Sequence, residues 1–306
     1  MNFSSMDYFV MAAQEKNFTH AAERLHITQQ TLSTHIANLE KELGSRLFVR
    51  STPLELTYAG QVFLAYATDF RRKRQTLERE MGDIANDQRG LLRIGIASTR
   101  GRTIMPPLIH AFREKHPFIT IKLIEAVNDQ LQQALLDGEV DLAIADFPRT
   151  VPGLEVRDFY QEEVVLLATR SLLERVYGPS AEALEEQIRR DGLKPLENCP
   201  FLFNSPQDIA GRIGRGLLAQ AGMVPRIAAE SSNMETLLSL CVLGEGVCFC
   251  PENLMRTALR QDEVDKLSLF RLGAEGRYMI RLACLKQEHR WSALEDFIHL
   301  ALGPAV

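Results

Sequence analysis

Apolar residues in the first 60 positions recur at helical spacing in two short stripes separated by a turn. The first stripe comprises Ala21, Ala22 and Leu25, and Ile27 closes the turn that follows. The second stripe begins after Thr28, whose side chain can cap a helix. Its members are Leu32, Ile36, Leu39 and Leu43. The pattern predicts a helix-turn-helix whose second helix starts at about Thr28.

The opposite face of this second helix carries short and amide side chains. Such side chains suit base edges in a major groove, because an amide can pair with adenine through two bonds and a threonine methyl can contact thymine. A face that contacts only water is the alternative. His35 is a candidate for a phosphate or groove-rim contact rather than a metal ligand, since no partner ligands lie at suitable spacing. The predicted DNA-contacting residues are Thr28, Gln29, Gln30, Thr31, Ser33, Thr34, His35 and Arg50.

A small wing and a long helix are predicted next. Residues 46–50 and 54–57 alternate like two strands on either side of a turn at 51–53. From Tyr58 the apolar residues change to three-four spacing without a proline. This seam comprises Phe63, Tyr66, Phe70, Leu77, Met81 and Ile84. A single seam is most simply buried against a second copy of the chain, which predicts a homodimer on double-stranded DNA with an interrupted palindromic operator.

Beyond Gly90 strands and helices alternate, which predicts an α/β domain with a largely parallel sheet. The expected strands span 91–96, 119–125, 140–145, 163–168, 201–203, 227–230, 246–250 and 278–285. The expected helices span 103–116, 129–136, 181–190, 211–221, 233–243 and 291–302.

Length and charge narrow the class of protein. The 306 residues exceed one typical domain, so two or three units are expected. Neither a membrane-spanning segment nor an export signal is recognisable, and we expect a cytoplasmic protein. The net charge of -5 is unusual for a general nucleic-acid binder. DNA affinity must therefore come from the placement of contacts and from oligomerisation.

The five cysteines do not form a recognisable disulfide framework, because their number is odd and no export signal precedes them. Cys248 and Cys250 lie two residues apart on a predicted strand and so share one face. A thiol switch is conceivable there, although buried packing as small apolar side chains is favoured.

Four sequence blocks resemble the LysR-type transcriptional regulators, and the resemblance covers essentially the whole chain. The blocks lie at 21–48, at 56–60, at 106–117 with 138–144, and at 244–251. The resemblance implies an α/β protein with an N-terminal winged helix-turn-helix, a long linker helix and a two-lobed effector domain like the periplasmic binding proteins. It also implies a small-molecule effector and assembly into a homotetramer.

The resemblance implies a winged helix-turn-helix DNA-binding domain over 1–58, a linker and dimerisation helix over 59–89 and an effector-binding domain over 90–306. Lobe I would take 91–162 and 268–306, and lobe II would take 163–267. The chain would cross between the lobes near 159–163 and near 265–269. The stretch 171–193 is longer than usual for the family and predicts an extra amphipathic helix on lobe II.

The effector site is expected where strands end at the cleft between the lobes. Ser98, Thr99 and Arg100 follow the first strand of the domain and precede a helix, where free amides and the helix dipole favour an anion such as a carboxylate. A simple helix cap is the alternative reading of these residues. The switch-point rule and the family pattern add Thr103, Asn128, Phe147, Asn204 and Ser205 as candidate effector contacts.

No catalytic motif is recognisable: the chain has no nucleophile elbow, zinc-protease motif or phosphate loop. We therefore expect no catalytic residues, no cofactor and no metal. Two alternatives to an effector-controlled DNA-binding regulator stay open. One is a thiol-based redox-sensing regulator, and the other is a solute-binding module without regulatory DNA binding.

Overall fold

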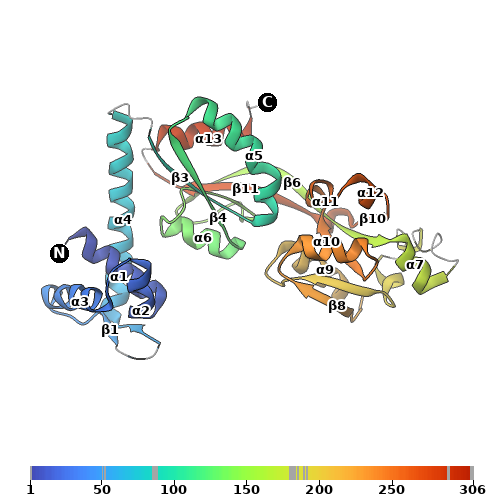
Figure 1. Cartoon of the computed structure of the whole chain (residues 1–306), viewed down its shortest axis with the longest axis horizontal. Coiled ribbons are helices and arrows are strands. Elements are labelled where there is room, and N and C mark those ends of the chain that lie inside the picture. Colours follow the sequence, from blue (N-terminus) through green and yellow to red (C-terminus); the bar gives the residue numbers. More distant parts are fainter. Residues whose placement is uncertain are drawn as a thin grey trace.

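The computed structural model describes residues 2–49, 51, 53–84, 89–178, 184, 186–188, 190, 192–287 and 290–303. A helical head and a long helix lie at one end of the molecule, and two lobes of mixed structure follow (Figure 1). Among the described residues, no helix is both long and apolar enough to cross a membrane.

The head is a bundle of α1 (Phe3–Glu15), α2 (Phe18–Arg24) and α3 (Gln29–Leu43) around a small apolar core that includes Phe9, Leu32 and Ile36. As predicted, α3 begins directly after Thr28, whose Oγ1 accepts a hydrogen bond of 3.1 Å from the amide of Thr31. It ends at Gly44, which has φ +64°, a backbone conformation that favours glycine. The predicted helix-turn-helix is confirmed.

The wing is also confirmed, although its strands are short: β1 (Phe48–Val49) pairs antiparallel with β2 (Glu55–Leu56). The linker helix α4 (Tyr58–Ile84) begins directly beyond it. Gly60 allows this helix to lie close to the wing, because a Cβ there would be 2.0 Å from the carbonyl oxygen of Leu47. The wing and the first turns of α4 are therefore packed as one unit with the head.

Each lobe contains a parallel sheet. In lobe I, β3 (Gly90–Ile96) lies between β4 (Ile119–Glu125) and β5 (Leu142–Ala145). In lobe II, β7 (Pro200–Asn204) lies between β8 (Arg226–Ser231) and β9 (Val247–Pro251). The expected parallel sheet is thus present within each lobe.

Two strands join the lobes and make the sheet mixed. They are β6 (Leu154–Thr169) and β11 (Arg277–Leu285), which pair antiparallel with each other and with strands of the lobes, giving nine strands in one sheet. The prediction of a largely parallel sheet was therefore wrong for the part of the sheet that connects the two lobes. The sequence predicted only 163–168 of β6, because the half of the strand before Glu163 is polar and carries no apolar run.

The chain returns from lobe II to lobe I later in the sequence than the expected residues 265–269. The strand β10 (Leu267–Arg271) still pairs with the lobe II end of β6, and Phe270 belongs to the lobe II core. The chain then turns through the short helix η3 (Gly273–Gly276) into β11. Gly276 lies against the other crossing strand, since a Cβ there would be 2.7 Å from the carbonyl oxygen of Val164. The two crossings are therefore in direct contact.

Helices cover both faces of the lobe I sheet (Figure 1). The pair α5 (Ser98–Lys115) and α13 (Ser292–Leu302) packs on one face through Phe112 and Phe297, and α6 (Asn128–Leu136) packs on the other through Leu131 and Leu135. Helix α5 starts at Ser98, earlier than the expected residue 103.

Lobe II contains the remaining helices. They are α7 (Arg170–Tyr177), α9 (Ile209–Gln220), α10 (Met234–Val242), α11 (Glu252–Ala258), α12 (Gln261–Val264) and the short η2 (Lys194–Leu196). The helix expected over 181–190 lies partly outside the described residues. Its described residues Leu184 and Ile188 are buried in the lobe II core.

Candidate DNA-reading face and effector cleft

The outward face of α3 presents most of the predicted DNA-contacting side chains to solvent. Thr28, Gln29, Gln30, Thr31 and Thr34 are exposed, while Ser33 and His35 are half-buried. The ring of His35 meets that of Tyr8 edge-on at 4.9 Å, so it lies at the rim between α3 and α1. Arg50 lies outside the described residues. The face is polar and uncharged, which suits base edges better than phosphates.

A hollow beside this face contains residues that the sequence did not single out. It has a volume of about 660 Å³ and is lined by Gln29 and Ser33 of α3, by the start of α2 and by the wing. Asn17 caps α2 by accepting hydrogen bonds from the amides of Thr19 (2.8 Å) and His20 (3.3 Å). Lys16 and His20 also line the hollow and are exposed. A cap followed by a helix start was the available sequence signal, and it marks a place suited to a phosphate.

A second hollow of about 660 Å³ lies between the two lobes. Of the predicted effector contacts, Thr99, Arg100, Asn128, Asn204 and Ser205 line it. Ser98 is the first residue of α5 and comes between the lining residues Ala97 and Thr99 in the sequence. The structure therefore brings together residues that are up to about a hundred positions apart in the sequence. Lining residues that the sequence did not single out include Glu125, Gln130, Gln207, Asp208 and Ser232.

Three predicted effector contacts, Ser98, Phe147 and Thr103, are not among the residues that line the hollow. Phe147 is only 1% exposed and belongs to the core between α6 and the lobe I sheet. Thr103 uses its hydroxyl inside α5, donating a hydrogen bond of 3.0 Å to the carbonyl oxygen of Arg100. Phe147 and Thr103 both follow strand ends, as the switch-point rule requires, but their side chains serve the packing of lobe I.

The helices that begin near this cleft differ between the lobes in whether a side chain caps their first turn. In lobe I, α5 follows Ala97 and α6 follows Val127, and neither helix has a side-chain cap. In lobe II, α9 is capped by Asp208 and α10 by Asn233. First-turn amides of a helix need acceptors, and an uncapped start next to a cavity offers its amides to an anion.

Arg100 meets a carboxylate of its own chain. It is 5% exposed, and its Nε donates to Glu162 Oε2 at 3.2 Å. Burial is the largest effect and would lower the pKa of Arg100, but the attraction of Glu162 together with those of Tyr278 and Tyr160 leaves this pKa raised. The hydroxyls of Tyr160 (3.2 Å) and Tyr278 also donate to this carboxylate, and burial raises the pKa of both tyrosines. Arg100 is thus part of a buried polar network under the cleft.

Ion pairs cross from one lobe to the other beside the cleft. Arg102 of α5 pairs with Glu235 of α10. Arg212 of α9 pairs with Asp146, which follows β5, at 2.8 Å. Each pair joins an element of lobe I to an element of lobe II, so opening of the cleft requires both to separate.

The five cysteines are all buried as free thiols. Burial raises the pKa of Cys241 to about 12 and holds the pKa values of Cys248 and Cys250 well above the ordinary range. A thiol that stays protonated is a poor nucleophile. Among the described residues, no cluster of three or more His, Cys, Asp and Glu side chains could hold a metal ion.

A winged helix-turn-helix joined by a long helix to a two-lobed domain with a central cleft defines a class of DNA-binding protein that carries its own ligand-binding domain. The comparisons with known proteins agree. Residues 3–61 match the family model for the bacterial regulatory helix-turn-helix protein, lysR family, and residues 85–303 match the LysR substrate binding domain. The chain belongs to the LysR family of transcriptional regulators. It is a sequence-specific DNA-binding regulator with an effector-binding domain.

Relatives of known name are regulators as well. The chain is 34% identical to the uncharacterized HTH-type transcriptional regulator YcgK of Bacillus subtilis, over 84% of this chain and 82% of the relative. It is 28% identical to the transcriptional activator IlvY of Salmonella typhimurium, over 84% and 85% of the two chains. Full-length CbnR in complex with its target DNA is 25% identical, with a TM-score of 0.59 over 98% of this chain and 99% of that chain.

Proposed function

We propose that α3 of this chain reads an interrupted palindrome on double-stranded DNA, and that a small anionic effector bound between the lobes changes this reading. The observation that carries the proposal is the cleft into which two uncapped helix starts open, in a molecule whose α3 face is exposed and uncharged. The proposal includes the division into a DNA-binding domain over 1–58, a linker helix over 59–89 and an effector-binding domain over 90–306. Lobe II is extended to the end of β10, because that strand packs in the lobe II core.

The proposed base contacts come from the exposed start of α3. Gln29, Gln30 and Ser33 can donate to and accept from base edges, and Thr31 and Thr34 can offer methyl groups to thymine. Thr28, His35 and the predicted contact Arg50 would hold the DNA backbone. The hollow at Lys16 and His20 adds a place for a phosphate beside the same face.

The proposed effector is a carboxylate held by the first-turn amides of α5 and α6. Because the guanidinium of Arg100 is already paired with Glu162, the anion would be bound mainly by backbone amides and by Thr99, Asn128, Asn204 and Ser205. Glu125 and Asp208 also line the cleft and disfavour a second negative charge. A monocarboxylate with hydroxyl or amine donors fits this arrangement best.

The proposed assembly is a homotetramer. The linker helix leaves an apolar seam in water, with Tyr66 62%, Leu77 55% and Met81 50% exposed, and a second copy would bury it. The two outer strands lie at opposite ends of the sheet, and each has an exposed apolar residue, with Phe118 beside β4 67% exposed and Ile227 on β8 50% exposed. These exposed apolar residues lie apart from the seam of α4, and they support contacts beyond the dimer, as a dimer of dimers requires.

A random-pool DNA selection with the purified protein tests the DNA reading. We expect an interrupted palindrome, and a reduction in its affinity of at least about tenfold with Gln29→Ala plus Ser33→Ala, since a lost base contact costs about 1–3 kcal/mol. Gln220→Ala plus Ser239→Ala, on exposed positions of lobe II, is the matched control and should leave the affinity unchanged. Recovery of no preferred sequence would favour a solute-binding module instead.

A further inference from the structure

A third cavity lies in lobe II and shares no lining residue with the cleft between the lobes. Its volume is about 660 Å³, within the range of about 300–1,000 Å³ that is usual for small-molecule pockets. Its walls come from Ile188, Gly192 and Leu193, from Leu217 in the second half of α9 and from the crossing segment 269–275. The proposed function uses none of these residues.

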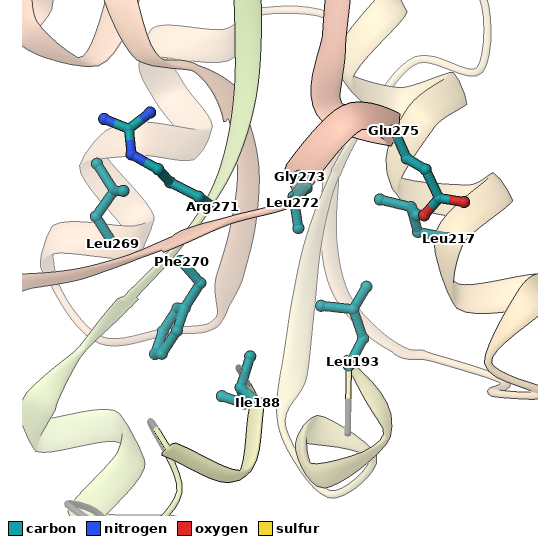
Figure 2. Close-up of a pocket in the computed structure, with 10 residues that line it drawn as sticks. Ile188, Leu193, Leu217, Leu269, Phe270, Arg271, Leu272, Gly273 and Glu275 are labelled. Atoms are coloured by element: carbon teal, nitrogen blue, oxygen red, sulfur yellow. The ribbon is translucent and has the colours of Figure 1, made fainter. Parts of the chain in front are cut away.

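The walls of this cavity are mainly apolar. Phe270 and Leu272 on the crossing segment point toward Ile188 and Leu193, and Leu217 of α9 lies at one side (Figure 2). Phe270, Ile188 and Leu193 are buried, whereas Leu217 and Leu272 are half-buried. The surface left open by the half-buried leucines is therefore available to an apolar ligand.

Two charged residues line the cavity, and they differ in whether another described residue pairs with them. Arg271 points to the other side of its strand (Figure 2), where it pairs with Glu163 at 2.7 Å and with Glu252 at 3.0 Å. Glu275 has no hydrogen bond or ion pair with any other described residue, and its carboxylate lies beside Leu217 (Figure 2). The described lining residues thus combine apolar walls with the unpaired carboxylate of Glu275 at the edge of the cavity.

We propose that this cavity is a second ligand site, which takes a small apolar amine with its ring or branched chain against Leu217 and Leu272 and its ammonium group at Glu275. Burial of the apolar part supplies most of the affinity, because an exposed ion pair contributes only about 0–1 kcal/mol. The charge of Glu275 selects cations over neutral and anionic analogues. This ligand carries a positive charge, whereas the carboxylate proposed for the cleft carries a negative one.

The position of the site connects it to movement of the lobes. Its wall at 269–275 is the segment through which the chain returns to lobe I, and Gly276 at the end of this segment touches the other crossing strand at Val164. Helix α9, which carries Leu217, also carries Arg212 of the ion pair that joins the lobes. An amine bound here therefore contacts elements that must shift when the cleft opens.

Ligand-observed NMR on the purified full-length protein tests the site with three matched probes: 2-phenylethylamine, 2-phenylethanol and 3-phenylpropanoate. We expect the amine to bind about threefold more tightly than the alcohol, as one exposed ion pair allows, and the carboxylate to bind most weakly. Glu275→Gln should make amine and alcohol equal. Glu197→Gln, an exposed acid elsewhere in lobe II, should leave the preference intact.

Location is tested by filling each cavity in turn. Leu217→Trp should abolish binding of the amine and the alcohol, whereas Ser232→Trp in the cleft between the lobes should not. The proposal is overturned if the amine does not bind, if Glu275→Gln leaves its preference over the alcohol unchanged, or if Ser232→Trp rather than Leu217→Trp removes it. Since Glu275 is exposed, its variant tests the site even if Leu217→Trp fails to fold.

Discussion

The side chain of Gln14 in α1 donates a hydrogen bond of 2.6 Å from Nε2 to Oε1 of Glu139, and so joins the DNA-binding head to lobe I of the same chain. Arg71 of the linker helix makes a second connection by donating to the carbonyl oxygen of Asp137 at 2.7 Å. Both acceptors directly follow α6, and the first residue of α6, Asn128, lines the effector cleft. One short helix therefore extends from the cleft to the head.

This connection predicts a specific crosslink. With Gln14→Cys and Glu139→Cys, a short bismaleimide should join the two positions within one chain, because their side-chain ends are in contact. The native cysteines should not compete, since all five are buried. Gln14→Cys with Gln130→Cys, at the cleft end of α6, is the control and should give no crosslink. Crosslinking is read as a shift in gel mobility, and equal yields for the two pairs would show that the head does not rest on the end of α6.

The buried pair of Arg100 and Glu162 predicts a large loss of stability when it is broken from one side. Glu162→Ala should lower the free energy of unfolding by about 3 kcal/mol, because it leaves a buried guanidinium without its carboxylate. Arg100→Met plus Glu162→Gln should recover most of this loss, since no charge stays buried and the tyrosine hydroxyls keep an acceptor. Urea unfolding followed by fluorescence of Trp291, the single tryptophan, measures both variants. A double variant as unstable as Glu162→Ala would show that the charge is not the cause.

Asp296 predicts a dependence of stability on pH. Burial alone would raise the pKa of Asp296, but hydrogen bonds from Lys115 (2.8 Å) and His116 (2.9 Å) outweigh it and leave the pKa lowered. A carboxyl whose pKa is lowered by folding stabilises the protein above its unfolded pKa of about 3.9 and loses this contribution as the pH falls through the lower folded value. Asp296→Asn should therefore reduce stability by up to about 1 kcal/mol at pH 7 and by progressively less at an acidic pH below the unfolded pKa. Urea unfolding at the two pH values measures the difference, and a constant effect of the substitution would contradict the assignment.

The buried thiols predict insensitivity to oxidants. Because burial raises the pKa of Cys241 to about 12 and that of Cys284 to about 11, these side chains stay protonated at neutral pH. Iodoacetamide should modify the folded protein at least about a hundredfold more slowly than the urea-unfolded chain. DNA binding should be unchanged after mild peroxide treatment. Rapid modification of Cys248 or Cys250 in the folded protein, identified by mass spectrometry, would instead favour the redox-sensing alternative.

The sequence by itself determined the local elements of the head. The apolar stripes of α2 and α3, the cap at Thr28 and the stop at Gly44 are each set by residues within one or two helical turns, so spacing and capping were sufficient to predict them. The seam of α4 and most strands of the two lobes follow from the same local rules. These patterns also carried the family resemblance, and with it the expectation of a regulator.

Tertiary structure alone decided what lies at the cleft. Arg100 and Phe147 carry the same local signal as Thr99 and Asn128, because all of them follow strands. Arg100 is nevertheless paired with Glu162, and Phe147 packs in the core, since the side chains that meet them come from distant parts of the chain. The antiparallel crossing strands and the contact between Gln14 and Glu139 likewise depend on how distant segments come together. Local spacing encodes which segments form, whereas burial and charge pairing between those segments decide which side chains are free to bind a ligand.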